Sequence, residues 1–195
     1  MNSKTTFRKK KWYGSLLIKG LILLVLASCQ GLPTENEEIG VVYPEISEAI
    51  SVLHPTAGND ARGTVTFTNV EEGLQVKVDV SGLTPGEHGF HIHKYGDCSA
   101  PDATSAEGHF NPHDKKHGGR LDEERHAGDL GNITADSNGY AKTEFVDSLI
   151  TFHGENSIIG RAVVIHAGKD DLESQPTGNA GARVACGVIG ISQAK

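Results

Sequence analysis

Hydrophobic and polar residues alternate along several short stretches of this chain, with β-branched residues at many apolar positions. This two-residue period predicts β-strands, because successive side chains of a strand point to opposite faces of a sheet. The predicted strands are 63–68, 74–80, 141–145, 162–165 and 184–189. Sequences rich in Gly, Pro, Asn and Asp separate several of them, and no sustained helical period follows the N-terminal segment. Several short strands of this kind predict an antiparallel β-sandwich or barrel.

Two long stretches, Lys94 to about Gly131 and Gly168 to Ala182, lack strand alternation. Loops of this length inside a compact domain are usually functional or disordered. The first stretch contains most of the histidines, so we expect a bound metal and a disulfide to order it.

The first 28 residues contain six basic residues and no acidic one, and they include an apolar run from Leu21 to Leu26. This pattern predicts an export signal over 1–28, because the apolar run is too short to span a bilayer and small residues follow it. Its removal would take the formal net charge of the chain from -7 to -13.

The segment from Leu26 to Cys29 resembles the lipobox of bacterial lipoproteins, in which the cysteine becomes a lipidated N-terminus; the alternative is a plain secretory signal. Three cysteines in an exported protein leave one unpaired, and a lipid on Cys29 would account for it. Cys98 and Cys186 are then free to form one disulfide. We interpret 29–47 as the lipidated N-terminus and a flexible tether, and 48–195 as one domain.

Seven of the ten histidines lie between His88 and His126, and imidazole is the commonest metal ligand of proteins. His91 and His93 stand two residues apart in a strand-like segment, so both rings face the same side, although a solvent-facing pair has the same spacing. His166 follows an apolar strand and is expected to approach that face from a neighbouring strand. Three or four imidazoles suit copper.

A second candidate set consists of His117, His126 and Asp129, a combination of nitrogen and oxygen ligands that suits zinc. Without the histidines, Asp129 would be interpreted as a loop-capping carboxylate. His109 is a further ligand for either set. Four histidines are left outside both sets: His54, His88, His113 and His153. We expect the ring of His88, on a turn, to make a structural hydrogen bond. We expect His113 to be solvated.

The order of these motifs over residues 48–192 resembles the copper,zinc superoxide dismutase family, in its bacterial exported, lipoprotein-type branch. The motifs that carry the resemblance are Gly89-Phe90-His91-Ile92-His93, Gly108-His109-Phe110-Asn111-Pro112, Lys116-His117-Gly118-Gly119, residues 122–132 and residues 178–190. The resemblance implies an all-β fold, an eight-stranded antiparallel Greek-key β-sandwich or barrel with two long functional loops. The second loop is shorter than in the animal enzymes, and Ser174-Gln175-Pro176 resembles the bacterial branch.

The resemblance also implies one copper and one zinc per subunit, with His109 as a bridge between them. The implied copper ligands are His91, His93, His109 and His166; the implied zinc ligands are His109, His117, His126 and Asp129. Asp170 would link His91 to His117, Arg183 would be the active-site arginine, and Thr177 would narrow the channel opposite it. Cys98 and Cys186 match the intrasubunit disulfide of the family.

The implied activity (class EC 1.15.1.1) converts two superoxide anions into dioxygen and hydrogen peroxide by copper redox cycling, with Arg183 docking the anion and His109 moving a proton. It would protect the cell envelope. The alternative is an exported copper and zinc buffer with little turnover, which would not need Arg183, Thr177 or Asp170. The expected location is a bacterial envelope, with the lipid on Cys29 in the membrane and the domain in the periplasm or outside the cell. The family contains both monomers and homodimers, and the acidic domain disfavours nucleic acid as a partner.

Overall fold

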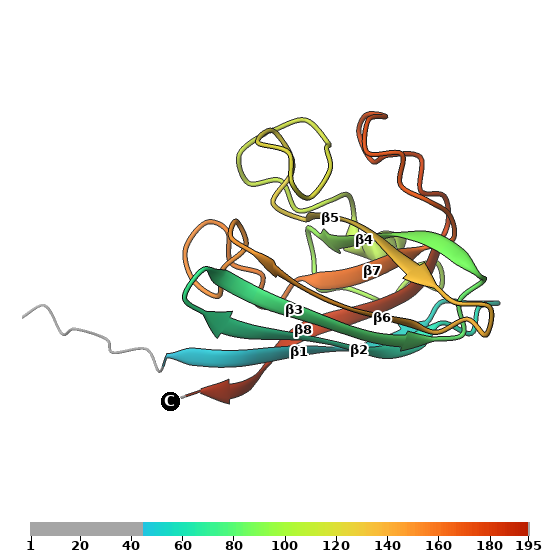
Figure 1. Cartoon of the computed structure of the whole chain (residues 1–195), viewed down its shortest axis with the longest axis horizontal. Helices are drawn as coiled ribbons and strands as arrows, with labels where there is room; N and C mark the ends of the chain where they lie inside the picture. The colour runs from blue at the N-terminus through green and yellow to red at the C-terminus, as the bar shows by residue number, and fades with distance from the viewer. Residues whose placement is uncertain (1–44, 195) are drawn as a thin grey trace, which may run out of the picture. The chain divides into compact units, whose positions relative to one another are not determined.

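The computed structural model describes residues 45–194, which form eight β-strands (Figure 1). The strands are β1 Ile46–Pro55, β2 Arg62–Val70, β3 Gly73–Ser81, β4 Gly86–His93, β5 Asp129–Ala135, β6 Ala141–Asp147, β7 Ala162–His166 and β8 Arg183–Ala194. Within this range the one helical element is a short 3₁₀ helix, η1, at Thr104–Ala106. No helix in residues 45–194 has the length and apolar character needed to cross a membrane.

All strand pairs are antiparallel, in the order β5-β4-β7-β8-β1-β2-β3-β6. The two end strands, β5 and β6, also contact each other, so the sheet curls into a nearly closed barrel. The connections from β3 to β4 and from β6 to β7 join strands that are not neighbours, as in a Greek key. The all-β fold predicted from the alternation of residues is therefore confirmed.

Strand β3 shows why the pattern forms a barrel. Its apolar side chains are buried at every second position, while Lys77 and Asp79 between them are exposed. The buried residues are Leu74, Val76, Val78 and Val80. Burying each such side chain stabilises the fold by about 1.5–3 kcal/mol, so the alternation fixes which face of the strand is inward.

Strand β7 differs because all five of its residues are buried. Val163 and Ile165 belong to the barrel core. Ala162 and Val164 point to the other face, where they pack in a second cluster with residues that include Ala106 of the long loop after β4. The continuous apolar run of β7 thus arises because a loop covers the outer face of the sheet.

The first loop, residues 94–128, and the second loop, residues 167–182, rise on the same side of the barrel, above β4 and β5 in Figure 1. The first loop is shorter than the sequence pattern indicated, because Asp129 already begins β5. Strand β1, from Ile46, was not predicted, and its first two residues lie in the expected tether. The predicted signal segment and Cys29 lie outside the described residues.

Candidate metal centre

The register of β4 and β7 places three histidines on the outer face of the barrel. His91 pairs with Val164, and His93 pairs with Ala162, the two β7 residues that point away from the core. His166 follows Val164 by two residues in the same strand, so its ring lies on that face as well. All three side chains are buried under the loops.

The first loop returns His109 to this face by running back along β4. Lys94 N–H donates to Gly108 O at 2.9 Å and Phe110 N–H donates to Ile92 O at 2.8 Å, which makes an isolated antiparallel bridge between His93 and His109. The ring centroids of His91 and His109 are consequently 4.0 Å apart.

Two sets of potential ligands result, and they share one residue. We call the first the four-histidine set: His91, His93, His109 and His166. We call the second the carboxylate set: His109, His117, His126 and Asp129. In each set the ligand atoms all lie within 4.8 Å of one another, and every member is buried. The structure thus brings together all seven ligands proposed from the sequence.

Backbone carbonyls fix which ring nitrogens carry protons in the four-histidine set. His93 Nδ1 lies 2.6 Å from Glu107 O, and His166 Nδ1 lies 3.0 Å from Gly181 O. Because a carbonyl oxygen only accepts, both Nδ1 atoms must donate, and each Nε2 keeps a lone pair. These two Nε2 atoms face each other at 3.4 Å, a pair of acceptors that a cation would satisfy.

Asp170 has the same effect on one histidine of each set. Its Oδ2 accepts from His91 Nε2 at 2.6 Å and its Oδ1 accepts from His117 Nε2 at 2.9 Å. Within the described residues His91 Nδ1, His117 Nδ1 and His109 Nε2 are buried without a hydrogen-bond partner. Buried polar atoms in that state are costly unless a ligand binds them, so the donors fit metal ions.

Asp129 is the centre of the carboxylate set. Its Oδ1 lies 2.7, 3.0 and 3.2 Å from the Nδ1 atoms of His109, His117 and His126. Its Oδ2 accepts from the backbone N–H groups of Gly118 and His126, at 3.1 and 2.8 Å. Three imidazole nitrogens and one carboxylate oxygen form a donor set that zinc binds in proteins.

The two sets differ in the pKa of their histidines. Burial lowers the pKa of both His109 and His166 to about 4, and it also lowers the pKa of His91 and His93. Burial acts in the same direction on His117, but the carboxylates of Asp129 and Asp170 beside its two ring nitrogens outweigh it and raise the pKa of His117 to about 9.

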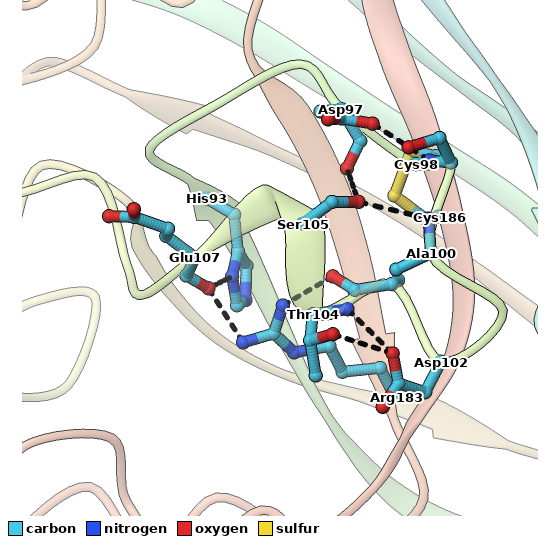
Figure 2. Close-up of a disulfide and its surroundings, with 12 residues drawn as sticks. His93, Asp97, Cys98, Ala100, Asp102, Thr104, Ser105, Glu107, Arg183 and Cys186 are labelled. Carbon is cyan, nitrogen blue, oxygen red and sulfur yellow. Dashed lines mark hydrogen bonds between the residues drawn. A yellow bond between two sulfur atoms is a disulfide. The ribbon is translucent and has the colours of Figure 1, made fainter.

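Arg183 is held beside the four-histidine set by carbonyls of the first loop (Figure 2). One guanidinium nitrogen donates to Ala103 O and the other to Glu107 O, the latter at 2.6 Å. Glu107 O also accepts from His93 Nδ1, so a single carbonyl positions both His93 and the arginine. Ala103 and Glu107 flank η1, and both have a φ of 58°, which turns the backbone at each end of the helix.

The predicted disulfide between Cys98 and Cys186 is present and ties the first loop to β8 (Figure 2). Ser105 of η1 strengthens this corner, because its hydroxyl donates to Asp97 O at 2.7 Å and accepts from Ala100 N–H at 3.1 Å. Disulfide, η1 and Arg183 thus form one connected unit next to His93.

The four histidines outside both sets do not contribute ligand atoms to either one. His88 is buried, and its ring bonds to His166 O at 2.8 Å and Thr84 O at 2.7 Å. The structural hydrogen bond expected for His88 is present, but the expected turn is wrong, because His88 lies within β4. His113 is exposed and bonds to Asn156, and His54 and His153 are exposed. Thr177 is half-buried in the second loop.

Sequence reasoning missed the buried ion pair between Arg125 and Asp147, whose charged groups are 2.7 Å apart. Arg125 also donates to the carbonyls of His126, Ala127 and Asp129, at 3.1 to 3.4 Å. It therefore fixes the backbone that carries two members of the carboxylate set. The sequence gives no signal for this role, because Arg125 follows three acidic residues and resembles an exposed loop residue.

Comparisons with known proteins agree with this geometry. The model of a family described as "Copper/zinc superoxide dismutase" matches residues 61–189. The superoxide dismutase [Cu-Zn] of Onchocerca volvulus is 50% identical over 159 residues, which cover 76% of this chain and 98% of the relative. The superoxide dismutase [Cu-Zn] of Paramecium bursaria Chlorella virus 1 is 43% identical over 187 residues, 92% of this chain and 95% of the relative.

Two further matches broaden the comparison. The extracellular superoxide dismutase [Cu-Zn] of Brugia pahangi is 48% identical over 153 residues, which cover 74% of this chain and 76% of the relative. Among solved structures, the crystal structure of the clock protein EA4 matches with a TM-score of 0.71 and 47% identity, over 77% of this chain and 98% of that chain.

Proposed function

This chain belongs to the copper/zinc superoxide dismutase family, and we propose that the four-histidine set holds its copper and the carboxylate set its zinc. The protein is an enzyme that converts two superoxide anions into dioxygen and hydrogen peroxide, with copper and zinc as its cofactors. The observation that supports the division is the donor chemistry: one set offers only imidazoles, which suit copper, and the other adds a carboxylate, which suits zinc.

Bound copper would supply the redox chemistry, and bound zinc would keep the bridging ring of His109 oriented. The protein's own contribution begins with Arg183, whose positive charge attracts the superoxide anion. Two of its N–H groups are used by the carbonyls of Ala103 and Glu107, so others remain to dock the anion. Because these carbonyls fix the guanidinium in advance, little reorganisation is needed when the anion arrives.

We propose His109 as the residue that delivers a proton to the peroxide product. Its Nδ1 faces Asp129 at 2.7 Å, and its Nε2 has no hydrogen-bond partner among the described residues and belongs to the four-histidine set. A proton held at Nε2 would therefore be close to the product. Thr177 of the second loop would narrow the channel opposite Arg183, and Asp170 of the same loop would link His91 to His117.

The experiment that tests this function is stopped-flow measurement of superoxide decay, with the protein reconstituted with copper and zinc or with zinc alone. Fast decay that depends on copper supports an enzyme that works by copper redox cycling. Slow decay with both metals firmly bound would instead favour the alternative of an exported metal buffer.

The finer predictions on location are also proposals. We propose a signal peptide over 1–28 and a lipid anchor on Cys29, which would hold the enzyme in a bacterial envelope. The lipobox-like sequence supports this, and the disulfide fits an oxidising compartment. The relative from Brugia pahangi that is named extracellular supports export. Radioactive palmitate should label the protein, and the label should disappear in Cys29→Ala.

A homodimer is a further proposal, supported by apolar side chains that face solvent on the neighbouring strands β1 and β8. Val52 of β1 and Val188 of β8 lie side by side on the outer face of the sheet and are 48% and 45% exposed. Contiguous apolar residues of this kind favour an interface. Sedimentation of the protein and of a Val52→Glu variant would test it, and a monomeric native protein would contradict it.

A further inference from the structure

The second loop contacts one member of the carboxylate set, His117, in two ways. Asp170 accepts a hydrogen bond from the ring of His117, as described above. Gln175, five residues later in the loop, bonds to the backbone of the same histidine, 58 residues away in the sequence. The Ser174-Gln175-Pro176 segment has no role in the proposed mechanism, so these contacts call for another explanation.

The side-chain amide of Gln175 is matched to the backbone of His117. Its Oε1 accepts from His117 N–H at 2.9 Å, and its Nε2 donates to His117 O at 2.9 Å and to Glu173 O at 3.1 Å. Because the first partner can only donate and the other two can only accept, the orientation of the amide is determined. Gln175 thus satisfies both backbone groups of His117, as a neighbouring strand would.

These bonds matter because His117 lies outside any strand. Its side chain is fully buried, and its segment between η1 and β5 has no sheet ladder to hold it. Without Gln175 the amide and carbonyl of His117 would have to find water at the edge of a buried site. An unsatisfied polar group in such a place is unfavourable, so the segment would shift and would carry the ring of His117 with it.

The second loop is built to present Gln175 in this position. Asp171 accepts hydrogen bonds from the backbone of Glu173 and from both the backbone and the hydroxyl of Ser174, at 2.6 to 3.0 Å. Gly178, with a φ of 66°, closes the loop against the ligand, since a Cβ there would overlap Asp170 Oδ1 and His117 Nε2. The second loop therefore packs in close contact with the ring of His117.

We propose that Gln175 is a positioning residue that sets the zinc affinity of the carboxylate set by fixing the backbone of His117. This inference rests on the proposed assignment of zinc to that set. Its consequence is reciprocal: the folded second loop strengthens zinc binding, and bound zinc stabilises the folded second loop. The short second loop would thereby contribute to zinc binding through the side-chain amide of Gln175.

The test is a zinc titration of the full chain in competition with a chromophoric chelator. Loss of a partner that orients a metal ligand typically weakens binding 10- to 100-fold, so Gln175→Ala should weaken zinc binding by about 10-fold. Copper binding by the four-histidine set should change by less than about twofold, because none of its members bonds to Gln175. Gln175→Glu should not restore zinc affinity, because its carboxylate would repel the carbonyl oxygens of Glu173 and His117.

Hydrogen exchange of the zinc-loaded protein provides a second readout. In Gln175→Ala the amide of His117 should exchange faster, while amides of β3 should not change. A purely structural role would accelerate exchange throughout the barrel and would lower the melting temperature equally with and without zinc. Either of those results would overturn the proposal.

Two control variants separate this inference from the proposed function. Lys169→Ala alters the same loop but removes only an exposed ion pair with Glu87, so it should leave zinc affinity unchanged. Asp129→Ala should abolish tight zinc binding. If Asp129→Ala weakens zinc binding and Gln175→Ala does not, the role of Gln175 is wrong and the zinc assignment stands. If neither variant affects zinc binding, both the assignment and the inference fall.

Discussion

The two ligand sets share His109 but are supported by different parts of the molecule. In the four-histidine set three members lie in β4 and β7, where sheet hydrogen bonds fix their backbones. In the carboxylate set no histidine lies in a strand, and only Asp129, the first residue of β5, belongs to the sheet. One site is thus built on the barrel and the other on loops.

The supports of the carboxylate set are side chains that bond to loop backbone. Asp129 holds the N–H groups of Gly118 and His126, Arg125 holds three carbonyls, and Gln175 holds His117. The contacts of Asp129 and Arg125 require the first loop to be folded, and the contact of Gln175 also requires the second loop. The difference indicates that folding of the sheet places three of the four members of the four-histidine set, whereas the carboxylate set depends mainly on the loops, and a metal bound there would in turn order them.

The largest expected effect comes from removing the carboxylate of the loop-supported site. Asp129→Ala should weaken zinc binding by more than the roughly 100-fold upper limit for losing an outer partner, because a ligand itself is lost. It should also lower the melting temperature of the zinc-treated protein while copper stays bound. Metal content after dialysis against a chelator checks this. Equal loss of copper and zinc would show that the two sites do not form independently.

The second effect concerns the disulfide that joins the first loop to the sheet. Replacing both Cys98 and Cys186 by serine should lower the free energy of unfolding by about 3 kcal/mol, since the bond closes a long loop of 88 residues. Urea unfolding monitored at fixed metal content measures this. An unchanged midpoint would mean that metal binding alone orders the first loop.

A third prediction concerns Arg183, which stands on β8 but is positioned by loop carbonyls. Arg183→Ala should lower kcat/KM by about 30-fold, equivalent to about 2 kcal/mol for a lost charged hydrogen bond, while both metals stay bound. The rate should also become less sensitive to salt. Arg183→Lys should recover part of the activity, because charge returns without the guanidinium geometry. Unchanged turnover in Arg183→Ala would remove this residue from the mechanism.

The strands that were predicted from the sequence have a more regular pattern of apolar and polar residues than the strands that were missed. The five predicted strands fall within β2, β3, β6, β7 and β8, where alternation or a buried apolar run is unbroken. Strand β1 was missed because its register shifts between Ile46 and Ala49 interrupt the two-residue period. Strand β5 was missed because Asp129, Gly131 and Asn132 make it resemble a loop.

The residues of the candidate site also fall into a group that could be predicted from the sequence and a group that could not. Histidines and Asp129 were identifiable because their side chains bind metals and because their motifs resemble a family. The partners that position them were not, since Glu107 acts through its carbonyl oxygen, which every residue has. Gln175 and Arg125 act through pairings that depend on how distant loops pack, and no local pattern encodes such pairings.

The smallest expected effect is a difference between the two sets in the number of protons that are released when a metal binds. The carboxylates of Asp129 and Asp170 flank both ring nitrogens of His117, so its pKa rises to about 9, above the ordinary histidine value of 6.5. In the metal-free protein this protonation contributes stability that is fully present below pH 6.5 and is lost as the pH rises through 9. At pH 7.5 His117 therefore carries a proton that zinc must displace.

The four-histidine set behaves in the opposite way, because burial lowers the pKa of His109 and His166 to about 4 and keeps their rings neutral at pH 7.5. Zinc binding should therefore release about one proton and copper binding almost none. Calorimetric titrations at pH 7.5 in two buffers of different ionisation enthalpy measure both numbers. At pH 10 the release on zinc binding should fall toward zero, since His117 is then already neutral. Equal proton release for the two metals would show that the carboxylates do not distinguish the sites electrostatically.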